Sequence, residues 1–200
     1  TTFSADSVCP TINMLNTKYF ILPTQQGGTM PLANPNAYGN AWFVGKVVYA
    51  ATAREEMDML KRIDRRNEAV VGKDFAAALG NATELRRDSA DAITLTAYEP
   101  NKLTYEVSSA NGGVAVLSEV YYPGWTAELD GQEIQIARAD YVLRAVKVPA
   151  GKHTLVLTFD PASLKTTEAV AYVAMAVMLL ALVCAAIISL RRRKTAKVKE

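Results

Sequence analysis

The residues best suited to binding chemistry are three aromatic side chains around a Pro-Gly bend. Tyr121 and Tyr122 precede Pro123-Gly124, and Trp125 follows. Exposed Tyr and Trp rings favour binding surfaces, and their faces can stack on the CH-rich faces of sugars. The commoner alternative is that these rings pack between two sheets while Pro123-Gly124 forms the bend. We therefore expect a weak glycan contact at Tyr121, Tyr122 and Trp125, weighed against a purely structural role.

The remaining reactive side chains form no recognisable catalytic pattern. His153 is the single histidine, and its position at the start of an expected strand indicates a surface or turn residue. Glu128 and Glu133 flank a hairpin, where facing carboxylates can form a glycosidase pair but more often serve solubility. The nucleophile elbow, P-loop, dinucleotide fingerprint and HExxH motifs are absent from the sequence. We therefore predict no catalytic residue, no cofactor and no metal ligand in this chain.

An apolar segment near the C-terminus is a candidate membrane span, and it indicates on which side of a membrane the rest of the chain lies. Residues 169–190 contain no charged residue, and 21 of these 22 residues belong to the hydrophobic class. As a helix, 22 residues are long enough to cross a hydrocarbon core of about 30 Å. We expect a transmembrane helix over residues 168–190, with Tyr172 in the interfacial aromatic belt. A buried helix of a soluble protein is the alternative, and the adjoining basic residues argue against it.

Charge is distributed unevenly along the 200 residues, whose formal net charge is +2. The last ten residues hold six basic and one acidic residue, so the other 190 hold 16 basic and 19 acidic residues. Basic residues beside a membrane segment favour the cytoplasmic side, which makes Arg191, Arg192, Arg193 and Lys194 a topology anchor. Residues 1–167 are then expected outside the cytoplasm, and a body there without a disulfide is compatible with a bacterial envelope. A nucleic-acid partner is not expected, because the basic residues lie directly against the bilayer, which is the expected partner.

The body of the chain shows two kinds of pattern. Thr52 and Glu55 fit a capping box, and Met57, Leu60 and Ile63 mark one face of the helix that follows. Residues 41–50 are typical of one strand. From Asp91 the hydrophobic period changes to two, with turn signals between short strands that include Asp130-Gly131. These patterns predict a mainly β fold: an antiparallel β-sandwich, preceded by a small α+β segment and followed by one C-terminal transmembrane helix.

We expect five parts in the chain. They are an entry segment and loop (1–40), a small α+β segment (41–90), an extracytoplasmic β-sandwich (91–165), the transmembrane helix (168–190) and a basic cytoplasmic tail (191–200). Cys9 and Cys184 fall on opposite sides of this arrangement and are not expected to pair. Since a body outside the cytoplasm must be exported, we expect the chain to be the C-terminal piece of a longer membrane protein.

One stretch of the sequence resembles a known family. Glu119–Pro161 contains a YYPGW…DG hairpin, the segment Ala139–Val146, and a VPAG.H turn before an apolar strand that ends in Pro. These elements resemble the C-terminal region of YfhO-like bacterial membrane proteins. Ile12–Ile21 and Ala37–Val44 also resemble segments of that family, although Gly39-Asn40 stands where Pro-Arg is more usual.

The resemblance implies a function that the residues themselves do not show. YfhO-like proteins look like polytopic glycosyltransferases of the GT-C type, which use a polyprenyl-phosphate sugar to modify envelope glycans or lipids. It implies that this chain is a non-catalytic, membrane-anchoring region beside an upstream membrane domain of the same polypeptide, which carries the catalytic residues. Its possible partners are then an envelope glycan or the polyprenyl-phosphate sugar. The alternative is a non-enzymatic, membrane-tethered β-sandwich that binds envelope glycan or a partner protein, and a membrane-anchored hydrolase is the least favoured reading.

Overall fold

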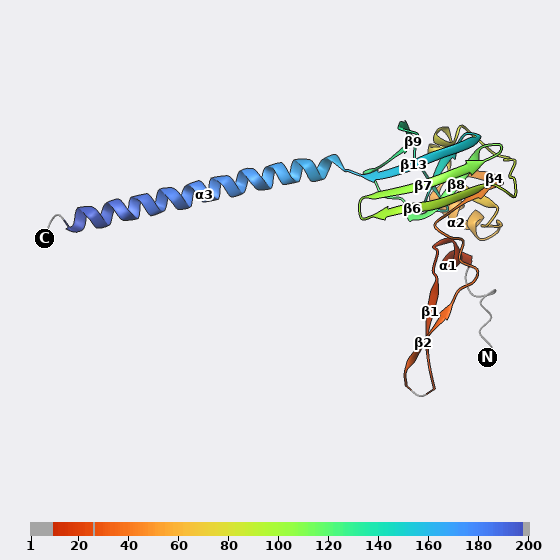
Figure 1. Ribbon diagram of the computed structural model, residues 1–200, viewed down its shortest axis with the longest axis horizontal. Helices are drawn as coiled ribbons and strands as arrows, with labels where there is room; N and C mark the ends of the chain where they lie inside the picture. Colours follow the sequence, from red (N-terminus) through yellow and green to blue (C-terminus); the bar gives the residue numbers. More distant parts are fainter. Residues whose placement is uncertain (1–9, 26, 198–200) are drawn as a thin grey trace. The chain divides into compact units, whose positions relative to one another are not determined.

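The protein folds into two units that are described separately. The computed structural model describes residues 10–25 and 27–197, and at 162, 165 and 189–197 it describes the backbone alone. The first unit extends to Phe159 and contains a two-stranded, a five-stranded and a six-stranded sheet (Figure 1). The second unit begins at Asp160 and contains one long helix. The predicted mainly β fold with a small α+β part and a C-terminal apolar helix is confirmed.

The five-stranded sheet carries the alternating sequences found after residue 91. Its order is β10-β9-β13-β7-β6, and all of its neighbours are antiparallel. Leu103, Tyr105 and Val107 are buried on one face of β7, while the residues between them are more exposed. This is the period-two burial expected when one face of a sheet meets water. The strands are β6 (Ala92–Glu99), β7 (Lys102–Ser109), β9 (Trp125–Leu129), β10 (Gln132–Ile134) and β13 (Gly151–Phe159).

The six-stranded sheet is buried on both faces. In β8, Val114 and Val116 belong to one hydrophobic cluster while Ala115 and Leu117 belong to the other. A strand covered on both sides has no polar face, which is why its sequence is a continuous apolar run. The order is β3-β8-β12-β11-β5-β4. The strands are β3 (Ala41–Val44), β4 (Lys46–Ala50), β5 (Glu68–Gly72), β8 (Gly113–Val120), β11 (Ala137–Ala139) and β12 (Leu143–Val148).

Segment 41–90 therefore contributes strands to the same sheet as segment 91–165. The single strand expected at 41–50 is wrong in one respect, because it divides at Gly45 into β3 and β4. β3 pairs with β8 and β4 pairs with β5, so the two strands stand at opposite ends of the sheet order. Gly45 is the single residue between them, so the two edge strands of the sheet meet at Gly45. The N–H of Gly45 donates to the Asn67 carbonyl (2.7 Å), which holds the chain in place at this corner.

Helix α2 (Ala53–Leu60) connects the parallel strands β4 and β5. The predicted capping box is present, because Thr52 Oγ1 accepts from the Glu55 N–H (3.2 Å) and the Glu55 carboxylate accepts from the Ala51 N–H (2.7 Å). The expected apolar face is only partly correct, since Met57 is 40% exposed. Glu56 takes its place on the buried face together with Leu60, because positions i and i+4 lie on the same side of a helix.

Short elements complete the first unit. The turn expected at Asp130-Gly131 is present, and both residues have positive φ, as a type I′ hairpin requires. Residues 72–90, which lack a clear pattern, begin with the last residue of β5 and continue as two 3-10 turns and a mostly irregular chain. The remaining elements are α1 (Pro10–Met14), β1 (Tyr19–Pro23), β2 (Thr29–Ala33), η1 (Lys73–Phe75) and η2 (Ala77–Leu79).

The second unit is α3 (Ala162–Lys197), a helix of 36 residues. Within it, Thr166–Ile188 is long and apolar enough to cross a membrane, and none of that span is buried. Tyr172 is exposed near its N-terminal end, and Cys184 is a free, exposed cysteine. Cys9 lies outside the described residues, as do the side chains of the predicted anchor Arg191, Arg192, Arg193 and Lys194. An apolar helix of this length, with no protein packed on it, supports membrane association.

The turn at Gly112 provides a test of the sandwich geometry. Gly112 has φ of +72°, and a Cβ there would meet the Val148 carbonyl oxygen at 2.8 Å. Gly131 has a similar φ of +79°, but its Cβ would meet open space. We expect Gly131→Ala to cost about 1 kcal/mol of unfolding free energy through backbone strain, and Gly112→Ala about 3 kcal/mol through strain plus the clash. Denaturant unfolding of both variants in detergent measures the difference, and equal losses would contradict the close approach at Gly112.

Candidate functional site

The predicted aromatic tract lies in the connection between β8 and β9. The N–H of Tyr121 donates to the Val142 carbonyl (2.7 Å), which fixes the start of the bend beside β12. Tyr121 and Trp125 are half-buried, whereas Tyr122 is 62% exposed. Trp125 and Tyr122 both contact the ring of Phe159, at centroid distances of 5.4 and 6.1 Å. The tract thus combines packing with exposure.

Tyr121 and Trp125 line one groove, and Tyr122 is not among its lining residues. The groove has a volume of about 550 Å³, which is the size of a small-molecule site. Phe75 forms a further aromatic part of its wall, with its ring 5.5 Å from that of Tyr121 at an interplanar angle of 72°. The lining residues are Asp74, Phe75, Ala77, Ala78, Tyr121, Trp125, Thr126, Glu133, Ile134, Gln135 and Ile136.

Two of the three aromatic rings of the groove are backed by arginine side chains. The guanidinium carbon of Arg144 lies 4.1 Å from the centroid of the Trp125 ring, and that of Arg138 lies 5.9 Å from the centroid of Phe75. Arg144 is buried, and its Nε–H donates to the Val120 carbonyl (3.0 Å). Burial lowers the pKa of Arg144 from its ordinary value. The negative face of an aromatic ring attracts a guanidinium, so these contacts stabilise the positions of the Trp125 and Phe75 rings.

The lining of the groove is acidic. Asp74 and Glu133 contribute carboxyl groups and Gln135 contributes an amide, while no Lys or Arg is among the lining residues. Aromatic faces beside carboxylate and amide acceptors suit a ligand with hydroxyl donors and apolar CH faces. The same carboxylates would repel a phosphate group. In its chemistry the groove fits a neutral glycan better than a sugar phosphate.

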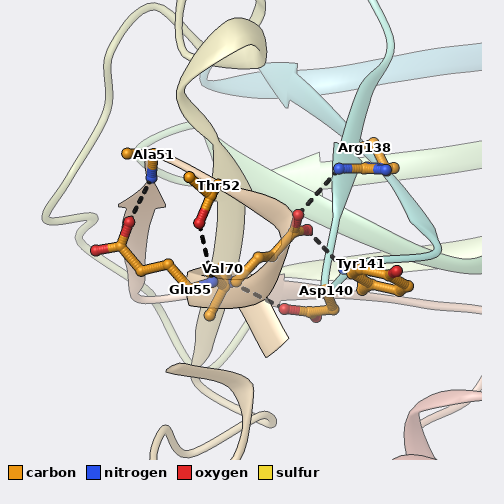
Figure 2. Close-up of polar contacts among 8 residues, drawn as sticks. Ala51, Thr52, Glu55, Val70, Arg138, Asp140 and Tyr141 are labelled. Atoms are coloured by element: carbon orange, nitrogen blue, oxygen red, sulfur yellow. Dashed lines mark hydrogen bonds and ion pairs between the residues drawn. The ribbon is translucent and has the colours of Figure 1, made fainter. Parts of the chain in front are cut away.

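A buried polar cluster joins helix α2 to Arg138 and Tyr141 at β11 and the turn after it (Figure 2). Glu56 is 1% exposed, and its carboxylate accepts from Arg138 Nη2 (3.0 Å) and from the Tyr141 N–H (2.7 Å). Arg138 lies between this carboxylate and the ring of Phe75. A buried carboxylate needs such partners, because the charge has left water. The cluster therefore fixes one wall of the groove.

Asp140 is the second buried carboxyl group of the cluster. Its Oδ1 accepts from the Val70 N–H (2.9 Å), and its own N–H donates to the Val70 carbonyl (2.7 Å), so it continues the contact between β11 and β5. Among the described residues its Oδ2 has no hydrogen-bond partner. Burial, reinforced by the nearby charge of Glu56, raises the pKa of Asp140 to about 7. Asp140 and Tyr141 both have positive φ (49° and 71°), an uncommon conformation outside glycine.

His153 lies away from the groove, on β13. Its Nδ1 is 2.6 Å from Asp130 Oδ2, and its Nε2 is 3.2 Å from the Ala150 carbonyl. The hydrogen bond to Asp130 raises the pKa of His153, while the Thr154 N–H and His153 lower the pKa of Asp130. The His153 side chain thus ties the turn before β13 to the β9-β10 hairpin. Its position is that of the surface or turn residue expected from sequence.

The two carboxylates considered for hydrolysis, Glu128 and Glu133, differ in whether they line the groove. Glu128 and Glu133 are register partners on β9 and β10, and both are exposed. Glu133 lines the groove and Glu128 does not. Among the side chains that the structure describes, no three His, Cys, Asp or Glu groups gather in a way that could hold a metal ion.

Sequence patterns identify one side of this groove and miss the other. Tyr121 and Trp125 stand out as an aromatic tract, but Asp74 and Phe75 come from the segment 72–90, which shows no hydrophobic period. Glu56 resembles a surface residue, because its neighbours in the helix are charged. The spacing of Glu56 to Leu60 is the one local signal for its burial.

The buried carboxyl of Asp140 predicts how stability depends on pH. Its folded pKa of about 7 lies above the unfolded value of about 3.9, so its contribution is fully present below about pH 4 and is lost as pH rises through about 7. Between pH 5 and 8 the unchanged protein should lose unfolding free energy on the order of 2 kcal/mol through ionisation of Asp140. The Asp140→Asn variant cannot ionise at this position, so this decrease should be absent from it. Denaturant unfolding across this pH range measures the change.

The matched control is His153→Gln, because the raised pKa of His153 also contributes stability that is lost as pH rises. The two changes should flatten the profile independently, since they act in different parts of the fold. An Asp140→Asn profile as steep as that of the unchanged protein would contradict a raised pKa for Asp140.

Comparison with known proteins finds one family to which part of the chain is similar. Residues 81–171 match the family described as bacterial membrane protein YfhO, which is less than half of the chain. Neither the curated proteins nor the solved structures contain a match. The matched residues include Tyr121, Trp125, Arg138 and Arg144, and they end inside the apolar helix. The strands β6 to β13 and the start of α3 are therefore similar to a region of the YfhO family of bacterial membrane proteins.

Proposed function

We propose that this chain is the membrane-anchoring, extracytoplasmic region of a YfhO-like glycosyltransferase, and that its aromatic groove holds the acceptor glycan. The match to a membrane protein family and the apolar helix support the anchoring role. The observation that carries the binding role is the groove formed by Phe75, Tyr121 and Trp125 beside Asp74 and Glu133. The catalytic residues would belong to an upstream membrane domain of the same polypeptide.

The charge of the groove selects between the two expected ligands. A polyprenyl-phosphate sugar carries phosphate, which the carboxylates of Asp74 and Glu133 disfavour. A neutral envelope glycan presents hydroxyl donors to these carboxylates and CH faces to the rings. We assign the groove to the acceptor, and the donor to the upstream domain.

Groove variants test this assignment. In a Trp42→Phe background Trp125 is the sole tryptophan, so its fluorescence reports on binding of glucose or N-acetylglucosamine oligosaccharides. Tyr121→Ala should weaken binding about tenfold through loss of a stacking face, and Glu133→Gln should weaken it less. Tyr98→Ala, which removes a 68% exposed tyrosine on the far edge of the same sheet, is the matched control. Phosphorylated forms of the same sugars should bind more weakly.

The same variants distinguish the enzyme from a simple binding module. In membranes that contain the complete gene product, transfer of labelled sugar from a polyprenyl-phosphate donor should fall in Tyr121→Ala and persist in Tyr98→Ala. Glycan binding without any sugar transfer would instead favour a non-enzymatic, membrane-tethered sandwich. Unchanged fluorescence with every oligosaccharide would remove the glycan role of the groove.

Topology is tested separately. We propose an inner-membrane protein in which residues 1–167 are extracytoplasmic and the tail is cytoplasmic, because basic residues next to a span are retained on that side. Replacing Arg191, Arg192, Arg193 and Lys194 with Gln should give a mixed orientation. Protease protection of a C-terminal epitope in sealed vesicles measures it, and an unchanged, uniform orientation would show that other segments set the topology.

A further inference from the structure

The two-stranded sheet β1-β2 is the part of the first unit that the groove and the cluster leave unexplained. Its strands pair with each other and with no strand of the two larger sheets (Figure 1). Nine of its ten residues, YFILP and TMPLA, are apolar, with Thr29 the exception. An exposed apolar ribbon of this kind marks a surface that contacts something other than water.

Apolar side chains are exposed on both faces of this ribbon. Tyr19 and Ile21 lie on one face and are 63% and 73% exposed. Met30 pairs with Leu22, so it lies on the opposite face, and it is 51% exposed. A flat protein surface would cover one face and leave the other in water. A medium in which the ribbon is immersed covers both faces at once.

Charge also points to lipid as that medium. No charged residue occurs from Tyr19 to Gly45, a run that contains both strands of the ribbon. Protein interfaces usually carry a polar rim, whereas a segment entering the bilayer interface must avoid charge, and acidic residues above all beside anionic lipids. Tyr19 is suited to the interface, where its ring can be apolar and its hydroxyl wet.

The chain itself keeps this unit close to the bilayer. β13 ends at Phe159 and the candidate span begins at Thr166, so six residues separate them. Asp160 and Pro161 link the strand to α3 and residues 162–165 are already helical, so the connection is short beside a strand of the ribbon, which is about 17 Å long. The outer backbone edges of both strands lack strand partners, so they need water and limit the ribbon to the headgroup level.

We propose that the β1-β2 ribbon enters the headgroup region of the bilayer, and that it forms a second membrane contact of this protein beside α3. The contact fixes the orientation of the first unit on the membrane, because a single tether leaves a domain free to rotate while two contacts do not. This proposal rests on the membrane helix and is independent of the glycan role of the groove.

Site-specific labels on the full 200-residue chain test the proposal. In a Cys9→Ser, Cys184→Ser background, Ile21→Cys and Met30→Cys place a polarity-sensitive fluorophore on each face of the ribbon. Glu128→Cys, an exposed position on β9, is the matched control. The proteins are reconstituted in phosphatidylglycerol and phosphatidylethanolamine vesicles that contain headgroup-region spin-labelled lipid. We expect blue-shifted emission and lipid quenching at both ribbon positions, and neither at the control.

Two other outcomes would overturn the proposal. Iodide quenching of the ribbon labels as strong as that of the control would show that the ribbon stays in water. Shielding from iodide without quenching by the lipid would show that protein covers the ribbon, either a second copy or another segment of this chain. A Leu22→Glu, Met30→Glu variant, checked for its native circular dichroism, should lose the lipid quenching of a label at residue 21.

Discussion

The buried carboxylate of Glu56 is the constraint on which the first unit depends most. Because this carboxylate is removed from water, it needs its hydrogen bonds to Arg138 and to the Tyr141 N–H. Removing one partner of a buried ion pair lowers the free energy of unfolding by about 3–5 kcal/mol. These bonds join α2 to the end of β11, where the chain turns through two left-handed residues. Arg138 then supports Phe75 in the groove. Helix, sheet and groove therefore share one cluster, and each can shift only if that cluster does.

The six-stranded sheet is buried on both faces and the five-stranded sheet on one, and this difference explains which strands could be predicted from the sequence. The five-stranded sheet meets water on one face, so its strands alternate and their positions could be predicted, down to the Asp130-Gly131 hairpin. The strands of the six-stranded sheet do not alternate between apolar and polar residues, so their sequences give no register and no partner. That β3 and β4 belong to the same sheet as β8 and β12 depends on long-range pairing, which no local pattern specifies.

The residues of the candidate groove were predictable to the same extent. Tyr121 and Trp125 form a compact aromatic tract, and a tract can be recognised in the sequence. The opposite wall comes from η1, a single turn too short to have a period, so Asp74 and Phe75 carry no local signal. Glu56 was hidden for another reason, since a charged residue in a charged helix indicates exposure and only tertiary packing reverses it. The groove thus combines the aromatic tract, which can be recognised in the sequence, with η1, which has no recognisable sequence pattern.

The electrostatics of the groove and of the membrane together restrict what the groove can bind. The groove contributes two carboxyl groups and lies on a unit that six residues tether to the bilayer span. The surface of a bacterial membrane is itself negative, so the local potential disfavours an anionic ligand twice over. A neutral glycan avoids both penalties, and an amino sugar gains from both. Under the proposed glycan role, the acidic lining of the groove therefore discriminates a sugar from a phosphate that carries it.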